Sequence, residues 1–455
     1  MGITLVECEK LGIPGVLESW DSPDMTRIAK DAFLLNGVPE CRQVYTPTDP
    51  SITDLSMYAQ DFIDALTVPR TAEESASGIY KPPTPPRILM TGTYDEIQDY
   101  FMGDLSRFPA DSSAAPISWM TDGGPIVPPT EERVAKMLTG TSHSPDEIIE
   151  EKMSPKEWIV TVEKVAINAV MAGCRPEYLP VVLAITAMSP PVNYPGDSSD
   201  GCLYVVSGPI AKEIGMNSFF CALAPVGNPA NTTIARAAAL IGINGGGVEV
   251  GLTCPNRTGN PIWSHTFAEA TDRSPWPGLN VERGYGADES VLLGGRCKGF
   301  IVPLNTGEIA SPDSLDEALV GTPEKAALSL RSARKTGGGF LMFTPSTAER
   351  WKEDFGFETI RELQEWLWYH TTWLKSDWET NYWICKDPLR YEKMQARERG
   401  TMQFNPDHLD LPDDGQVPVF LNGPEQITII VSGGDGQGWG FGGWTFRDTS
   451  IDDWR

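Results

Sequence analysis

The stretch SPKEWIVTVEKVAINAVMAGCRPEYLPVVLAITAM at residues 154–188, with the segment CLYVVSG that follows at 202–208, decides the class of fold. Ser154 is a typical helix N-cap and Gly173 a typical helix end. The first stretch therefore predicts one helix between these residues and a second helix directly after it. The apolar run at 202–208 predicts a buried strand. Two helices that lead into a buried strand indicate an α/β protein.

The same alternation continues along the rest of the chain. Further helices are expected at 129–140, 231–243 and 314–334, with one helix or a pair of helices at 359–378, and further strands at 262–269, 290–295, 299–304 and 425–434. A GxGxxG string at 438–443 follows the last strand, but no helix signal comes after it, so we interpret it as a loop and not as a dinucleotide site. The sequence predicts an α/β fold with mixed or parallel sheet layers covered by helices.

Composition divides the chain into three regions. Residues 1–70 predict a truncated α/β piece, and residues 71–128, rich in proline, serine and glycine, predict a linker or an arm laid over a neighbouring subunit. Residues 129–455 are expected to form the main α/β domain, with an aromatic-rich C-terminal part typical of packing or subunit contact. The elements expected in the first region are strands at 13–19 and 41–47 and helices at 22–37 and 51–67.

Charge and composition exclude several classes of protein. The chain has 455 residues with 62 acidic and 36 basic side chains, a net charge of −26, which argues against nucleic-acid partners and anionic membranes. We find no apolar run long enough to span a membrane and no signal peptide. The eight cysteines form no CxxC pair, which indicates a reduced, cytoplasmic chain, and the four dispersed histidines indicate no metal site. No cofactor motif is recognised.

The first candidate site is the turn that contains Cys174. A thiol beside Arg175 and just before a helix start is in a setting that lowers its pKa and favours a thiolate nucleophile. Glu177 and Tyr178 in the following turn are candidate proton carriers. The alternative is a small buried cysteine that fills the corner between two helices.

The second candidate site is the helix start in the string GNPANTTIARA at 227–237. Asn231 is interpreted as the N-cap, and no acidic residue follows in the first turn, so the helix start is expected to bind an anion. Asn228 and Thr232 would contribute polar contacts, and Arg236 would add positive charge. The alternative is an ordinary capped helix.

The third candidate site is the polar segment SHTFAEATDRSPWPGLNVERGYG at 264–286. Glu269 near Trp276 is a candidate general acid, because desolvation raises the pKa of a carboxyl group, and Arg283 is a candidate substrate ligand. The alternative is a loop of solvated charges. Asn193, between prolines, is a further candidate to line a pocket, with a purely structural turn as its alternative.

Several strings resemble the UGSC-motif (seleno)protein family and its separate-chain relatives. They are TEERVAKMLTGTSHSPDEII, VEKVAINAVMAGCRPEYLPVVLA, GPIAKEIGMNS, GNPANTTIARA and SPWPGLNVERG, within about 127–310, with a weaker likeness at ITIIVSGGDGQGWGFGGW and in the first 70 residues. The resemblance implies thiol or selenol redox chemistry, but this chain has no Cys-Gly-Ser-Cys string. A partner chain would have to supply that motif, or the chemistry is lost, and Cys174 is retained within the matching AGCRPEY.

These observations lead to one main functional hypothesis and two rivals. The main hypothesis is an enzyme of reductase, lyase, hydratase or cyclase type, fitting specialised metabolism, that acts on a small and anionic substrate. Its expected catalytic residues are Cys174, Glu177, Tyr178 and Glu269, and its expected substrate-binding residues are Asn193, Asn228, Asn231, Thr232, Arg236, Trp276 and Arg283. The first rival is a non-catalytic or half-site subunit of a homo- or hetero-oligomer, and the second is a metal site of carboxylates and histidines.

Overall fold

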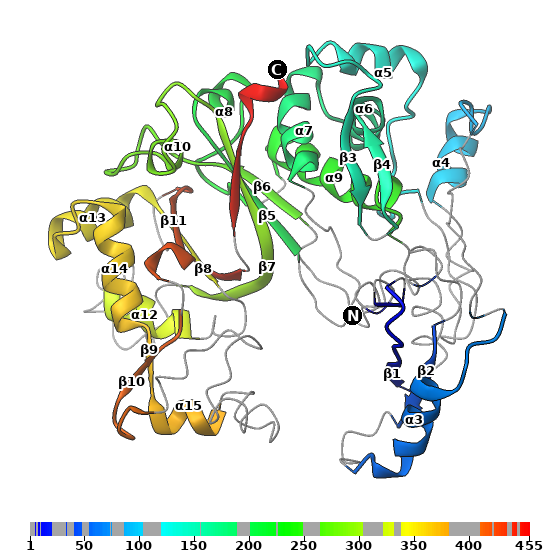
Figure 1. Ribbon diagram of the computed structural model, residues 1–455. Helices are drawn as coiled ribbons and strands as arrows, with labels where there is room; N and C mark the ends of the chain where they lie inside the picture. Colours follow the sequence, from blue (N-terminus) through cyan, green and yellow to red (C-terminus); the bar gives the residue numbers. More distant parts are fainter. Residues whose placement is uncertain are drawn as a thin grey trace.

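The computed structural model describes the chain in segments (Figure 1). The described residues are 5, 8, 9, 11–20, 33, 41–47, 54–72, 74, 86–102, 120–154, 156–188, 201–223, 226–248, 264–303, 322–331, 338–381, 410–420, 423–434, 439–443 and 446–455. Within these segments, none of the helices combines the length and the apolar character that a membrane span requires.

A mixed sheet forms the centre of the fold, which confirms the predicted α/β class. Its strands, in spatial order, are β11 (Ile427–Val431), β8 (Gly338–Phe343), β12 (Trp439–Gly443), β7 (Val291–Pro303), β5 (Gly201–Ser207) and β6 (Ser264–Ala268), with β13 (Arg447–Ser450) paired to β7.

The two halves of this sheet share one topology. In the first half β5 is parallel to β6 and antiparallel to β7, and in the second half β8 is parallel to β11 and antiparallel to β12. The carboxyl ends of the two outer strands also meet. The N–H of Ala270 donates to the carbonyl of Val431 at 2.8 Å, and the Ser432 hydroxyl donates to the carbonyl of Ala268 at 2.7 Å. The sheet is therefore curled, so that its two outer strands meet at their carboxyl ends.

Side-chain alternation explains how the curled sheet is packed. On its inner face Leu203, Val205, Phe267, Phe340 and Ile430, from four strands, share one apolar cluster. The intervening residues point outward into two helical layers, because successive strand side chains face opposite sides. The layer on the first half is built mainly from α6 (Val162–Ala172), α7 (Leu179–Ala187) and α9 (Pro229–Asn244). The layer on the second half is built from α12 (Pro323–Leu330), α13 (Pro345–Phe355) and α14 (Ile360–His370) (Figure 1).

The tryptophan-rich region belongs to this second layer. Trp351 is fully buried, and its ring lies 4.8 Å from that of Phe343, while Trp276 and Trp366 pack in the same cluster. The aromatic residues therefore stabilise the packing of helices on the sheet, as expected. The remaining elements of the main part are α5 (Glu131–Leu138), β3 (Ile148–Met153), β4 (Trp158–Thr161), α8 (Pro209–Glu213), α10 (Leu279–Glu282), β9 (Thr372–Leu374), α15 (Lys375–Asn381) and β10 (Gln416–Pro418).

Four predicted elements differ from the structure. The helix predicted from Ser154 is instead β4 followed by α6, because residues 158–161 pair with β3, and Thr161 is the N-cap whose side chain accepts from the Lys164 N–H. The two strands predicted at 290–295 and 299–304 are one strand, β7. The string at 438–443, interpreted as a loop, contributes β12, since it pairs with β7 and β8 on its two sides.

The N-terminal region contains a small α/β unit. It pairs β1 (Leu17–Trp20) in parallel with β2 (Gln43–Thr46) and adds α3 (Ala59–Thr67). Arg42 binds Glu74 at 2.9 Å and donates to the carbonyls of Ala65 and Val68 near the end of α3, which fixes the helix beside the strands. The helix predicted at 22–37 lies outside the described residues apart from Phe33.

The region 71–128 contains a helix, α4 (Tyr94–Met102), that sequence patterns did not indicate. The Gln98 amide exchanges two hydrogen bonds with the backbone of Ile126, at 2.8 and 2.9 Å, and both Phe101 and Ile126 join the core of the first helical layer. Helix α4 and the segment around Ile126 thus pack on the main domain of the same chain.

Candidate functional site

The carboxyl ends of the parallel strands β5 and β6 place Ser207 and Glu269 side by side. Their backbones are joined there, because the Glu269 N–H donates to the carbonyl of Val206 at 2.9 Å. The carboxyl ends of neighbouring parallel strands are a common place for ligand sites in α/β proteins, so these residues are candidates for a site.

Glu269 is a buried carboxyl group with only one anchored oxygen. Glu269 is 5% exposed. Its Oε2 atom accepts hydrogen bonds from the Ser207 hydroxyl at 2.5 Å and from the Leu279 N–H at 2.8 Å. Among the residues that the structure describes, no donor reaches its Oε1. The side chain is therefore held in one orientation while one oxygen remains available to a ligand.

Burial gives Glu269 an acid–base character suited to neutral pH. Desolvation raises the pKa of its carboxyl group to about 7, and the nearby charge of Glu282 acts in the same direction. The hydrogen bonds from Ser207 and from the Leu279 backbone oppose this rise. A carboxyl group with this pKa exists in both protonation states near pH 7, as general acids and bases require. The predicted rise in the pKa of Glu269 is confirmed.

The loop that supports Glu269 is fixed by Asn280. Its backbone N–H donates to the Ser207 hydroxyl at 3.3 Å, and its amide donates to the carbonyls of Gly286 and Glu289 at 3.1 and 3.0 Å. Gly278 permits the close approach, because a Cβ there would lie 2.8 Å from the Asn280 Oδ1. Neither Asn280 nor Ser207 was among the sequence candidates, since a buried asparagine or serine looks the same in sequence whether it supports a site or a turn.

Cys174 does not have the lowered pKa that the sequence predicted. Its thiol packs against the core of the first helical layer, and burial raises its pKa to about 12, against a hydrogen bond with Thr233 that lowers it. Gly173 has a φ of 86° and ends α6, and the Cys174 N–H closes the turn onto the carbonyl of Ala169 at 2.9 Å. Cys174 therefore occupies the position after a left-handed helix end, where an apolar contact is usual.

The neighbours of Cys174 do not activate it. The Arg175 side chain is 65% exposed and reaches Glu177 only at 4.0 Å. Glu177 is exposed, and Tyr178 is buried, which raises the pKa of its phenol. Neither residue has the environment of Glu269.

The start of α9 uses its polar side chains within the chain. The prediction of Asn231 as N-cap is wrong, because the helix begins at Pro229 with Asn228 as N-cap residue, and no acidic residue lies in its first turn. Asn231 exchanges hydrogen bonds with the backbone of Asn217, both at 2.9 Å, and the Asn228 amide donates to the carbonyl of Cys221 at 2.8 Å. Thr232 lies in the first turn and is half-buried.

Arg236 is held by a carboxylate of the same chain. Its guanidinium donates two hydrogen bonds to Asp122, at 2.9 and 2.8 Å, and one to the carbonyl of Gly124 at 3.1 Å. The expectation that Arg236 adds free positive charge to an anion site is therefore wrong, because Asp122 already neutralises it.

Asn193, another predicted ligand, lies outside the described residues.

Trp276 is part of the core. The Trp276 indole N–H donates to the carbonyl of Phe357 at 2.9 Å, and the residue is 3% exposed within the second helical layer. The substrate-binding role expected of Trp276 is wrong, because the polar atom of its ring is already bonded and buried.

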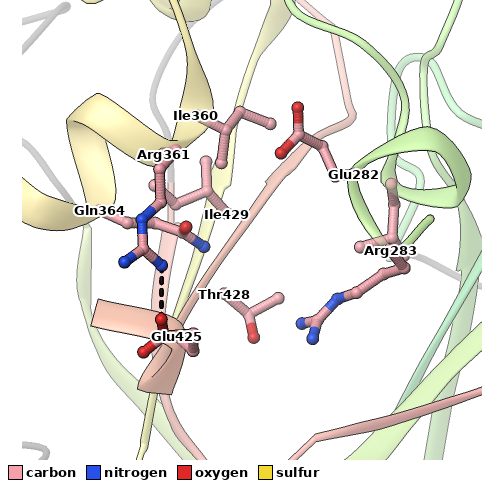
Figure 2. A pocket seen from close by; sticks show the side chains of 9 residues that line it. Glu282, Arg283, Ile360, Arg361, Gln364, Glu425, Thr428 and Ile429 are labelled. Atoms are coloured by element: carbon pink, nitrogen blue, oxygen red, sulfur yellow. Dashed lines mark hydrogen bonds and ion pairs between the residues drawn. The ribbon is translucent and has the colours of Figure 1, made fainter. Parts of the chain in front are cut away.

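Arg283, one of the predicted ligands, lines a pocket (Figure 2). The pocket has a volume of about 160 Å³ and lies between α10 and α14, next to β11. Leu279 connects it to Glu269, because the Leu279 side chain lines the pocket and its N–H binds the carboxylate. The other lining residues are Glu282, Ile360, Arg361, Gln364, Glu425, Thr428 and Ile429.

The predicted regions are linked by hydrogen bonds but do not form one constellation. The carbonyl of Asn217 accepts from the Asn231 amide and, at 3.4 Å, from the Ala268 N–H, and this joins the start of α9 to the residue before Glu269. Cys174 touches α9 on Thr233. Helix α10 contacts both Glu269, through the Leu279 N–H, and the pocket that Arg283 lines. Over the described ranges, no group of three or more His, Cys, Asp or Glu side chains is arranged to hold a metal ion.

No family model, no curated protein and no solved structure matches this chain.

Proposed function

We propose that this chain is an enzyme that transfers a proton on a small organic substrate, with Glu269 as the acid–base group. One observation carries the proposal: a buried carboxyl group with a pKa of about 7 lies at the carboxyl ends of two parallel strands, with one oxygen anchored and the other available. Perturbed carboxyl groups of this kind are concentrated at active sites.

The protonation states of Glu269 and Cys174 indicate the class of reaction. In its ionised form Glu269 takes a proton from a substrate C–H or O–H group, and in its protonated form it returns the proton to another atom of the same substrate. No oxidant or reductant is needed, so isomerase, lyase and hydratase reactions fit better than thiol-dependent reduction. The Cys174 thiol, with a pKa of about 12, stays protonated at neutral pH.

A proton-exchange assay tests this function. The full chain is incubated in D₂O at pH 7 with a panel of small keto, hydroxy and amino acids, and loss of substrate C–H signals is followed by ¹H NMR. E269Q keeps oxygen acceptors for Ser207 and Leu279 but removes the base, so exchange should fall by about 10²- to 10⁴-fold. E353Q, on the exposed face of α13, is the matched control and should exchange like the wild type.

A purely structural role for Glu269 predicts a different result. In that case E269Q would exchange protons as fast as the wild type, and the proposal would be wrong. That outcome, together with a second co-purifying chain, would favour a half-site subunit instead. Membership of the UGSC-motif family is a separate proposal, which rests on the strings quoted above.

A further inference from the structure

The pocket between α10 and α14 carries polar groups that the chain itself does not use (Figure 2). Thr428, on β11, is 3% exposed, and its hydroxyl has no hydrogen-bond partner among the described residues. The Thr428 oxygen is not one of the fully enclosed unpartnered atoms of the described residues, so it stays accessible from the pocket, and an acceptor on a ligand can receive a hydrogen bond from it.

Arg283 provides a second unsatisfied group in the same pocket. Its side chain is 27% exposed and has one long contact, 3.9 Å, with the Asp448 carboxylate. Arg361 on the opposite wall differs, because it donates to Glu425 at 2.6 Å and to Glu365 at 2.7 Å. In Figure 2 the Arg283 guanidinium points toward Thr428, so the two side chains offer N–H and O–H donors to one anionic group.

Acceptors face the pocket from other positions. The Gln364 amide donates its N–H to the carbonyl of Ile427 at 2.7 Å, which leaves its oxygen for another donor. The Glu282 carboxylate has no hydrogen-bond donor within the described segments, and Figure 2 shows it across the opening from Thr428. Glu282 is exposed, so its carboxylate is accessible to a cationic or N–H-bearing group of a ligand.

We propose that this pocket binds a small zwitterion of the amino-acid class, with its carboxylate on Arg283 and Thr428 and its ammonium group near Glu282 and Gln364. The pocket volume of about 160 Å³ equals that of about five molecules of liquid water. This is enough room for a small amino acid. Arg361 on the opposite wall is already paired with Glu425 and Glu365, so Arg283 and Glu282 are the charges that a ligand would contact. The proposal concerns binding alone and does not depend on proton transfer by Glu269.

Ligand-observed NMR titrations of the full chain with three probes test the class of ligand. Glycine carries both groups, acetate only the carboxylate and methylammonium only the cation. Glycine is expected to bind at least about fivefold more tightly than acetate, which is the gain from one further charged hydrogen bond, and methylammonium is expected to bind most weakly. Absence of glycine binding, or equal Kd values for glycine and acetate, would overturn the proposal.

Two variants locate the binding. T428V keeps the shape of the side chain in a strand position and should weaken glycine binding about fivefold, and R283M should weaken it about tenfold or more. R350M, an exposed arginine on α13, is the control and should bind as the wild type does. Because the Thr428 hydroxyl has no bond to lose, T428V should not lower the melting temperature. Glycine affinity unchanged in a folded T428V would contradict the assignment.

Discussion

At the scale of single residues, the proton on Glu269 couples this side chain to the stability of the whole chain. Burial raises its pKa from 4.5 to about 7, so between these values the folded state binds more protons than the unfolded state. The free energy of unfolding therefore falls as the pH rises from about 4.5 to about 7, and it levels off above. The shift corresponds to about 3 kcal/mol.

E269Q should remove this pH dependence. Glutamine does not ionise, so the difference in unfolding free energy between E269Q and the wild type should move by about 3 kcal/mol in favour of E269Q between pH 4.5 and pH 7.5. Urea titrations at the two pH values measure it, with E353Q as a reference for an exposed carboxylate. A difference that stays constant with pH would show that Glu269 is not desolvated.

Cys174 should be a slow thiol. With a pKa of about 12 its thiolate fraction at pH 8 is about 10⁻⁴, whereas an ordinary cysteine is about one quarter ionised. Brief alkylation with iodoacetamide at pH 8, read by peptide mass spectrometry, should modify the exposed Cys221 well before Cys174. Equal or faster labelling of Cys174 would restore the hypothesis of an activated nucleophile.

At the scale of secondary-structure elements, the pair Arg236–Asp122 ties residues 120–128 to α9. Both side chains are about a quarter exposed, and the contact is bidentate at 2.9 and 2.8 Å. A double-mutant cycle with R236Q and D122N should give a coupling energy of about 1–2 kcal/mol in urea unfolding. The exposed pair Arg87–Glu131 is the comparison, and its coupling is expected to be clearly smaller because water screens both charges. Equal coupling in the two pairs would contradict this interpretation.

Sequence patterns predicted the elements whose signals are local. Thr130 and Gly173 mark the ends of α5 and α6 through their own side chain or backbone, and the apolar run of β5 has no competing pattern. Ser154-Pro155 has the pattern of a helix start, yet the next residues form β4, because pairing with β3 overrides local preference. The length of β7 likewise depends on its partners β5, β12 and β13.

The candidate site was predictable only in part, for a similar reason. The raised pKa of Glu269 was expected because Trp276 lies close in the sequence, and an aromatic neighbour can desolvate a carboxyl group. The low pKa expected for Cys174 failed because the sequence does not show that its sulfur packs inward. Thr428 gave no signal at all, since an unpaired hydroxyl is defined by the neighbours it lacks.

At the scale of the whole molecule, the inner cluster of the curled sheet belongs to both halves. Phe267 of β6 is fully buried and shares this cluster with Phe340 and Ile430 of the other half. Loss of its ring therefore weakens packing on both sides, and the two halves should unfold together.

F267A should lower the free energy of unfolding by about 3–5 kcal/mol. Trp276 and Trp351 lie in the second helical layer, so tryptophan fluorescence should shift in urea together with far-ultraviolet circular dichroism, which reports both halves. Y369A, at a site 71% exposed, should change stability by less than about 0.5 kcal/mol. A fluorescence midpoint that stays unchanged in F267A would show that the halves unfold independently.

The contact between the ends of β6 and β11 also bears on aggregation. The outer strands of an open sheet present unpaired N–H and C=O groups that recruit strands of other molecules. Here the Ala270 N–H and the carbonyl of Val431 satisfy each other, and the Ser432 hydroxyl occupies the carbonyl of Ala268. At these ends the two outer strands offer fewer free groups to a second chain, so the contact that brings the two halves together should also disfavour strand addition there.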